Sequence, residues 1–135
     1  MTKTSRLTVT ALTAAIALGA APAAAFASDS SHGGGGGVTR SGSCTGSTDW
    51  KLKAKADDGR LEVEFEVDSN QVGQTWQVRL TDNGSQFFAG TRRTVAPSGS
   101  FSVETRTANK AGTDRIVASA TNAATGEVCR GALAI

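Results

Sequence analysis

The segment WKLKAKADDGRLEVEFEV, residues 50–67, constrains the fold more than any other part of the chain. On each side of Asp58-Gly59, apolar residues occupy every second position and charged residues fill most of the positions between them. A period of two is typical of a β-strand with one buried face. Asp-Gly favours a two-residue type I′ turn, which joins two antiparallel strands. The segment therefore predicts a hairpin with one solvated face.

The charges in this hairpin also predict its register. With a two-residue turn, each lysine of the first strand lies opposite a glutamate of the second: Lys51 opposite Glu66, Lys53 opposite Glu64 and Lys55 opposite Glu62. Sliding one strand by one residue would turn all of these charges into the core. The apolar and charged patterns thus specify the same pairing.

The rest of the chain continues the same pattern. Asn83-Gly84 predicts a second hairpin, in which Leu80 lies opposite Phe87 and Val78 lies opposite Ala89. Further alternating segments follow at residues 101–106, 115–121 and 127–134, and a short strand is expected around Cys44. Turns recur every 8–12 residues, which is typical of antiparallel sandwiches. We expect an all-β fold, an antiparallel Ig-like β-sandwich of seven or eight strands. A closed barrel is the alternative, because local patterns do not separate the two.

The beginning of the chain indicates export. Lys3 and Arg6 precede an apolar run at residues 7–21, and Ala25-Phe26-Ala27 fits a cleavage site. The apolar run is shorter than the roughly 20 residues that cross a bilayer. We expect a signal peptide at 1–27, a flexible Gly-rich tail at 28–40 and a β-sandwich domain at 41–135. The mature protein is expected to be secreted and extracellular, with no membrane attachment.

Cys44 and Cys129 are the two cysteines of the chain. In an exported protein they favour one intramolecular disulfide, which here encloses 84 residues and ties the first strand to the last. A redox-active pair usually has much closer spacing.

Charge and side-chain chemistry exclude several classes of function. Without residues 1–27 the chain keeps 12 basic and 12 acidic residues, because Lys3 and Arg6 account for two of the 14 basic ones. A net charge of zero disfavours a nucleic-acid binder. The single histidine, His32, lies in the Gly-rich tail, so histidine-based catalysis and metal sites are not expected in the domain. The available carboxylates fall at predicted turns or on solvated faces: Asp57, Asp58, Glu104, Asp114 and Glu127. We expect no enzyme activity, no cofactor and no metal.

Four residues form a candidate binding patch. With the pairing above, Phe88 points away from Phe87 and out of the sandwich, beside Arg79 and near Arg92 and Arg93. An outward aromatic ring among arginines suits an anionic or sugar ligand. The alternative is that Phe88 is covered and the arginines are simply solvated, since a bulge near Arg92 would reverse the facing. Trp50 and Trp76 are in phase with core positions, so we expect both to be internal.

Several motifs give the chain a family resemblance: Trp-Lys-Leu-Lys at 50–53, the Asp-Gly hairpin, and Gly-Glu-x-Cys at 126–129. Over residues 41–135 it resembles small secreted proteins of high-GC Gram-positive bacteria. The resemblance implies a β-sandwich and export. It implies no particular activity and transfers no functional residues.

The sequence therefore predicts a secreted, non-catalytic, monomeric β-sandwich that acts as an extracellular binding or accessory module. Two kinds of partner are alternatives: a carbohydrate or other cell-envelope polymer, or a protein bound in an inhibitor-like manner. For the second, residues 95–98 form the candidate loop.

Overall fold

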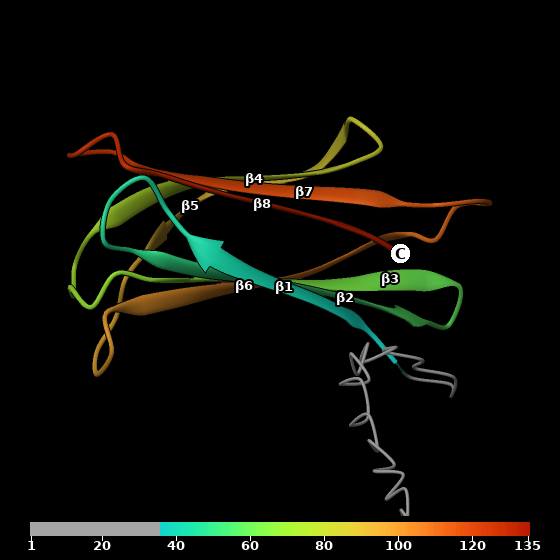
Figure 1. Cartoon of the computed structure of the whole chain (residues 1–135), viewed down its shortest axis with the longest axis horizontal. Coiled ribbons are helices and arrows are strands. Elements are labelled where there is room, and N and C mark those ends of the chain that lie inside the picture. The colour runs from blue at the N-terminus through green and yellow to red at the C-terminus, as the bar shows by residue number, and fades with distance from the viewer. Residues whose placement is uncertain (1–35) are drawn as a thin grey trace, which may run out of the picture.

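The computed structural model describes residues 36–135, and these form an all-β domain of eight antiparallel strands (Figure 1). The predicted signal peptide, and the tail residues before 36, lie outside the described residues. The strands are β1 (Val38–Ser43), β2 (Asp49–Asp57), β3 (Arg60–Asp68), β4 (Thr75–Asp82), β5 (Ser85–Arg93), β6 (Ser100–Ala108), β7 (Arg115–Asn122) and β8 (Val128–Ala134). Within this part of the chain no helix is present that could span a bilayer.

Two four-stranded sheets face each other across the core. The first sheet has the order β1-β2-β3-β6 and the second the order β5-β4-β7-β8 (Figure 1). The predicted antiparallel β-sandwich is confirmed. Strand β1 begins earlier than predicted, because residues 38–40, which were assigned to the flexible tail, pair with residues 52–54 of β2. The strand expected around Cys44 ends at Ser43, and Cys44 directly follows it.

The register of the β2–β3 hairpin is confirmed at every pair. Lys51 lies opposite Glu66, Lys53 opposite Glu64 and Lys55 opposite Glu62. Two of these pairs form salt bridges, each with an Nζ–Oε2 distance of 3.6 Å. The turn residues Asp58 and Gly59 have φ angles of 49° and 71°, as a type I′ turn requires.

The predicted register of the β4–β5 hairpin is wrong beyond its first two pairs. Asp82 and Thr81 pair with Ser85 and Gln86, but the register then shifts between Leu80 and Thr81. Leu80 consequently lies opposite Phe88, and Val78 opposite Gly90. Phe87 is the extra residue of a β-bulge, which moves every later side chain of β5 to the other face of the sheet.

The core consists of the inward-facing residues of both sheets, and Trp76 is its largest fully buried side chain. Trp50 is half-buried and packs against the edge of this core. Its ring lies against glycines of two strands, because a Cβ built on Gly42 of β1 would come within 2.9 Å of Cζ2, and one built on Gly131 of β8 would overlap the ring. Trp76 is internal, as predicted, whereas Trp50 packs against the core but stays half-buried.

The disulfide Cys44–Cys129 ties the end of β1 to β8, as predicted. Hydrogen bonds hold the loop after Cys44 in the same place. The backbone N–H groups of Gly46 and Thr48 donate to Oε1 of Glu127, over 3.1 and 3.0 Å. The N–H of Thr45 also donates to the carbonyl of Val128 over 2.9 Å. Glu127 is therefore part of a structural clamp beside the disulfide.

At the opposite end of the sandwich, two carboxylates are buried. Lys110 Nζ lies 3.1 Å from Oδ2 of Asp82, whose side chain is 1% exposed. The expectation that Asp114 is a surface charge is wrong, since it is fully buried. The backbone of Asp114 pairs with Ile135 in both directions, and its Oδ2 accepts the N–H of Lys110 over 3.1 Å. Ile135 thus extends the pairing of β7 and β8 to Asp114.

Candidate binding face

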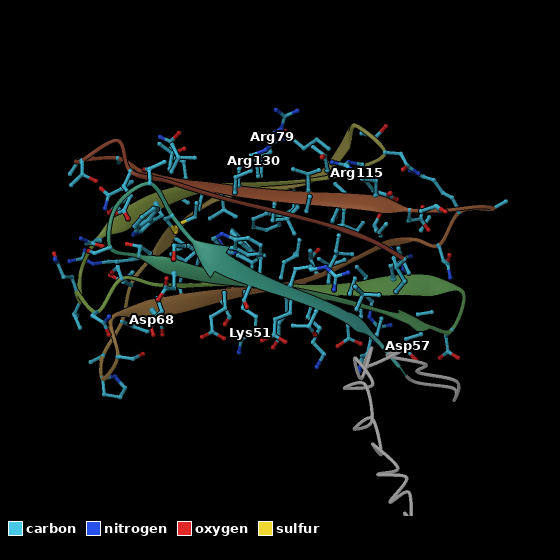
Figure 2. The ribbon with its side chains drawn as sticks, viewed as in Figure 1. Lys51, Asp57, Asp68, Arg79, Arg115 and Arg130 are labelled. Carbon is cyan, nitrogen blue, oxygen red and sulfur yellow. A yellow bond between two sulfur atoms is a disulfide. The ribbon has the colours of Figure 1, made fainter. Side chains whose placement is uncertain are left out.

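The exposed side of the β5-β4-β7-β8 sheet carries arginines from all four strands, and we call it the arginine face. Its exposed arginines are Arg79, Arg93, Arg115 and Arg130. Figure 2 shows Arg79, Arg115 and Arg130 projecting from this sheet, on the side opposite to Lys51, Asp57 and Asp68. Strand alternation directs them outward, since each follows or precedes a buried core residue.

The arginine face has no acidic side chain to balance these charges. The only acid in its four strands is Asp82, which is buried and paired with Lys110. Within residues 36–135 none of the four arginines forms a salt bridge. The exposed side of the other sheet differs, because there Arg106 contacts Asp57 at 3.0 Å and Glu62 at 3.7 Å, in addition to the lysine–glutamate pairs. On the exposed side of the β1-β2-β3-β6 sheet, positive and negative side chains form ion pairs, whereas the arginine face is positively charged.

Sheet register places the arginines at three levels along the strands. Arg79, Ser119 and Arg130 form one row across β4, β7 and β8. Arg115 lies four residues along β7 from Ser119, at one end of the sheet. Arg93 pairs with Thr75, four residues along β4 from Arg79, toward the other end. At about 3.4 Å per residue, successive levels are about 14 Å apart.

The turn residue Asn83 fixes the position of Arg115. Its Oδ1 accepts the backbone N–H of Arg115 over 2.9 Å, and its own N–H donates to the carbonyl of Arg115, also over 2.9 Å. The Nδ2 group donates to the carbonyl of Thr113 over 3.3 Å. The β4–β5 turn is thereby attached to the start of β7.

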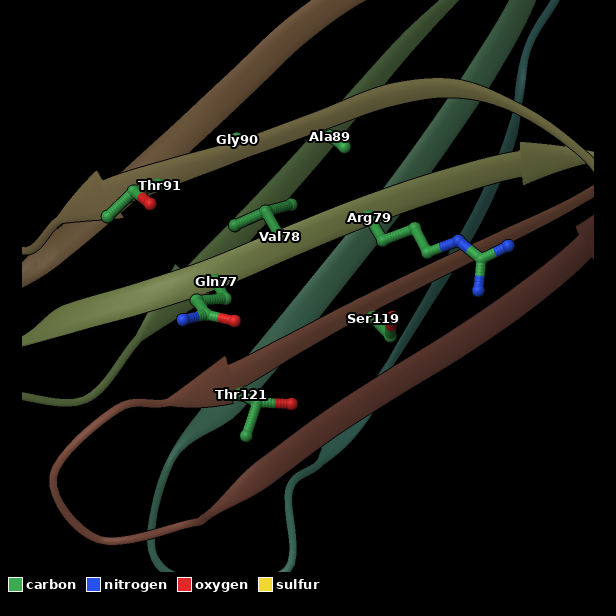
Figure 3. Close-up of a pocket in the computed structure, with 8 residues that line it drawn as sticks. All are labelled: Gln77, Val78, Arg79, Ala89, Gly90, Thr91, Ser119 and Thr121. Atoms are coloured by element: carbon green, nitrogen blue, oxygen red, sulfur yellow. The ribbon is translucent and has the colours of Figure 1, made fainter.

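Two shallow, open depressions adjoin on the arginine face, and Arg79 and Ser119 border both. The first, the charged depression, has a volume of about 360 Å³ and is lined by Arg79, Thr81, Asn83, Gly84, Arg115, Val117, Ser119 and Arg130. The second, the neutral depression, has a volume of about 560 Å³ and is lined by Gln77, Val78, Arg79, Ala89, Gly90, Thr91, Ser119 and Thr121. Figure 3 shows the polar side chains around the neutral depression, with Arg79 extending away from it.

The four residues of the predicted patch do not form one surface. Arg79 and Arg93 lie on the arginine face, as exposed residues. Phe88 pairs with the buried Leu80 and packs against the core, so the alternative stated above, in which this ring is covered, is the one that the structure shows. Arg92 lies on the same inner side at the edge strand, where its guanidinium carbon is 5.1 Å from the centroid of the Phe88 ring. With the bulge at Phe87, Phe88 and Arg92 face inward, whereas Arg79 and Arg93 face outward.

Sequence reasoning missed two residues of the arginine face, Arg115 and Arg130. Both alternate with inward residues, Ile116 and Cys129, and this signal was available in the sequence. Their convergence with Arg79 depends on β7 lying between β4 and β8, which is a matter of sheet order.

The residues that suit an inhibitor-like loop form a tight turn. The N–H of Val95 donates to the carbonyl of Ser100, and the N–H of Gly99 donates to the carbonyl of Val95, over 3.0 and 2.9 Å. Val95 itself is 57% exposed. The loop bonds largely to itself, and it does not offer the extended backbone that pairs with a partner strand.

The chemistry of the arginine face is that of anion binding. Guanidinium groups donate forked pairs of hydrogen bonds to carboxylate or phosphate oxygens. Among the described residues no group of three or more potential metal ligands occurs.

No protein-family model, curated protein or solved structure matches this chain. The resemblance to small secreted proteins of high-GC Gram-positive bacteria therefore stays a prediction.

Proposed function

We propose that this protein is a secreted, non-catalytic binding module that uses the arginine face to hold an anionic polymer of the cell envelope. The observation that carries the proposal is the set of four exposed arginines without acidic partners in the described chain. In a protein with equal numbers of acids and bases after residue 27, such segregation leaves a positive face available to a negative ligand.

Export is supported by two features. The first 27 residues have the composition of a signal peptide, and the disulfide is of the kind that persists in oxidising compartments. We further infer an Ig-like connectivity, since β4 and β5 belong to one sheet while β3 and β6 pair in the other, as in a Greek key. We also propose that the protein is monomeric.

Co-sedimentation tests the proposal. The mature chain, residues 28–135, is incubated with an insoluble envelope preparation that retains its anionic polymers, and with the same preparation after those polymers have been extracted. We expect the protein in the pellet only when the polymers are present. The triple variant Arg79→Gln, Arg115→Gln and Arg130→Gln is expected to stay in the supernatant.

A matched control removes charge from the other face. The triple variant of β2, with Lys51, Lys53 and Lys55 each changed to Gln, loses the same amount of charge and is expected to sediment like the wild type. Equal sedimentation of the two triple variants, or retention on the extracted preparation, contradicts a specific role of the arginine face.

A further inference from the structure

The arginine levels carry information about the spacing of charge in the ligand. Arg115, the Arg79–Arg130 pair and Arg93 follow one another at intervals of four residues along the strands. These intervals are each about 14 Å between Cα positions. The sheet backbone fixes these intervals and the arginine side chains extend outward from them, so a ligand binds best when its anions recur at comparable intervals.

Neutral side chains fill the rows between the arginine levels. Thr81 lies opposite Val117 in one row, and Gln77 lies opposite Thr121 in another, with Thr91 beside Gln77 on β5. Hydroxyl and amide groups both donate and accept hydrogen bonds, which suits the hydroxyl groups of a sugar. Val117 gives the charged depression an apolar surface at its centre, on which the C–H face of a sugar ring can rest.

The arginine face has no aromatic platform. Among residues 36–135 every tryptophan and phenylalanine is buried or packs against the core: Trp50, Phe65, Trp76, Phe87, Phe88 and Phe101. Proteins that bind single-stranded nucleic acid stack bases on exposed aromatic rings. The face therefore favours a ligand held by charge and by hydrogen bonds.

Rigidity favours a polysaccharide over a flexible polyphosphate or polyol phosphate. A ligand that already holds its anions at a fixed interval loses less conformational entropy on binding. Sugar rings provide this stiffness, and their hydroxyl groups match the neutral rows.

We infer that the ligand is a linear acidic polysaccharide in which carboxylated sugars are separated by neutral sugars, and that it lies along β4 and β7 with carboxylates at the arginine levels. This inference rests on the proposed function and specifies the polymer that the arginine face binds.

The test compares short polymers of defined charge spacing by isothermal titration calorimetry at about 150 mM salt, where exposed charges beyond about 8 Å are largely screened. Hyaluronan oligosaccharides carry a carboxylate on alternate sugars, and polygalacturonate oligosaccharides of the same length carry one on every sugar. Polyphosphate provides charge without sugar hydroxyls, dextran provides sugar without charge, and single-stranded DNA tests a nucleic acid. We expect hyaluronan to bind most tightly and dextran not to bind.

Variants assign the binding to particular rows. Changing Arg79, Arg115 and Arg130 together to Gln is expected to weaken hyaluronan binding about ten-fold or more, since several charge-assisted hydrogen bonds are lost. Changing Gln77 and Thr121 together to Ala is expected to weaken it a few-fold while leaving polyphosphate binding unchanged. Circular dichroism and thermal unfolding verify that each variant is folded, which is expected because all these side chains are on the surface.

The outcomes separate this inference from the proposed function. Tighter binding of polygalacturonate, polyphosphate or DNA than of hyaluronan overturns the inferred charge spacing. The proposed function as an envelope-binding module is retained in that case if sedimentation with the envelope depends on the arginines. Hyaluronan binding that survives in the triple arginine variant overturns the inference, and the proposed function is overturned as well if that variant still sediments with the envelope. Binding in the order expected, lost with the arginines and reduced with Gln77 and Thr121, supports both.

Discussion

Gly131 and Trp50 provide a sharp test of how the two sheets are packed at their β1–β8 side. A Cβ at Gly131 would lie 2.7 Å from both Cε3 and Cη2 of Trp50 and even closer to Cζ3. Gly131 itself is a buried strand residue with no positive φ. In a strand, alanine is otherwise favoured over glycine by about 0.5–1 kcal/mol. Whether Gly131→Ala raises or lowers the free energy of unfolding therefore depends on the steric overlap with the ring of Trp50.

We expect Gly131→Ala to destabilise the protein. Forcing an extra methyl group into a packed core costs about 1–3 kcal/mol, so the net loss in the free energy of unfolding is about 1–2 kcal/mol. For a domain of this size, each kcal/mol of lost stability lowers Tm by roughly 4–8 °C. Equilibrium unfolding in urea, monitored by circular dichroism, measures this loss. The change in the free energy of unfolding follows from the shift of the urea midpoint when the slope of free energy against urea concentration stays constant.

A double-mutant cycle isolates the contact. Trp50→Leu alone is expected to destabilise the protein by about 3 kcal/mol, because it leaves a cavity. In that background Gly131→Ala is expected to be neutral or stabilising, since the ring that it overlaps is gone. If Gly131→Ala is harmless in the wild type, or equally costly in both backgrounds, Trp50 does not occupy the space described here.

Two further changes test the ends of the sandwich. Replacing Cys44 and Cys129 together by Ala frees a loop of 84 residues in the unfolded chain, and we expect a loss of up to about 4.6 kcal/mol in urea unfolding; a loss below about 1 kcal/mol contradicts this role. Lys110→Met leaves the buried Asp82 carboxylate without its cation and is expected to cost about 1–2 kcal/mol in thermal unfolding, after allowance for the exposure of the lysine. The control Lys53→Met, on the solvated side of β2, is expected to change stability by less than about 0.5 kcal/mol, and an equal effect of the two changes would show that the buried pair contributes nothing.

Local patterns predicted the β2–β3 hairpin completely because three constraints coincide there. The Asp58-Gly59 turn, the apolar alternation and the facing charges all require the same register. In β4–β5 the turn at Asn83-Gly84 fixes only the first two pairs. Two consecutive phenylalanines then leave the phase of β5 undetermined, and core packing accommodates both through the bulge.

The arginine face was only partly predictable for a different reason. The outward direction of Arg79, Arg115 and Arg130 follows from alternation within each strand. Their proximity depends on which strands are neighbours, and β4 lies beside β7 although β5 and β6 come between them in sequence. The position of Asp114 likewise involves a distant partner, because its backbone pairs with that of Ile135.

The position of the disulfide governs how the domain responds to mechanical load. The start of β1 and the C-terminal Ile135 lie toward the same end of the sandwich, whereas Cys44 follows the far end of β1 (Figure 1). Tension applied between the two termini passes through the covalent bond from residue 44 to residue 129 and bypasses the 84 residues between them. Pulling can therefore peel only β1 and the part of β8 after Cys129, which includes Arg130, while β4 and β7, which carry Arg79 and Arg115, remain unstretched.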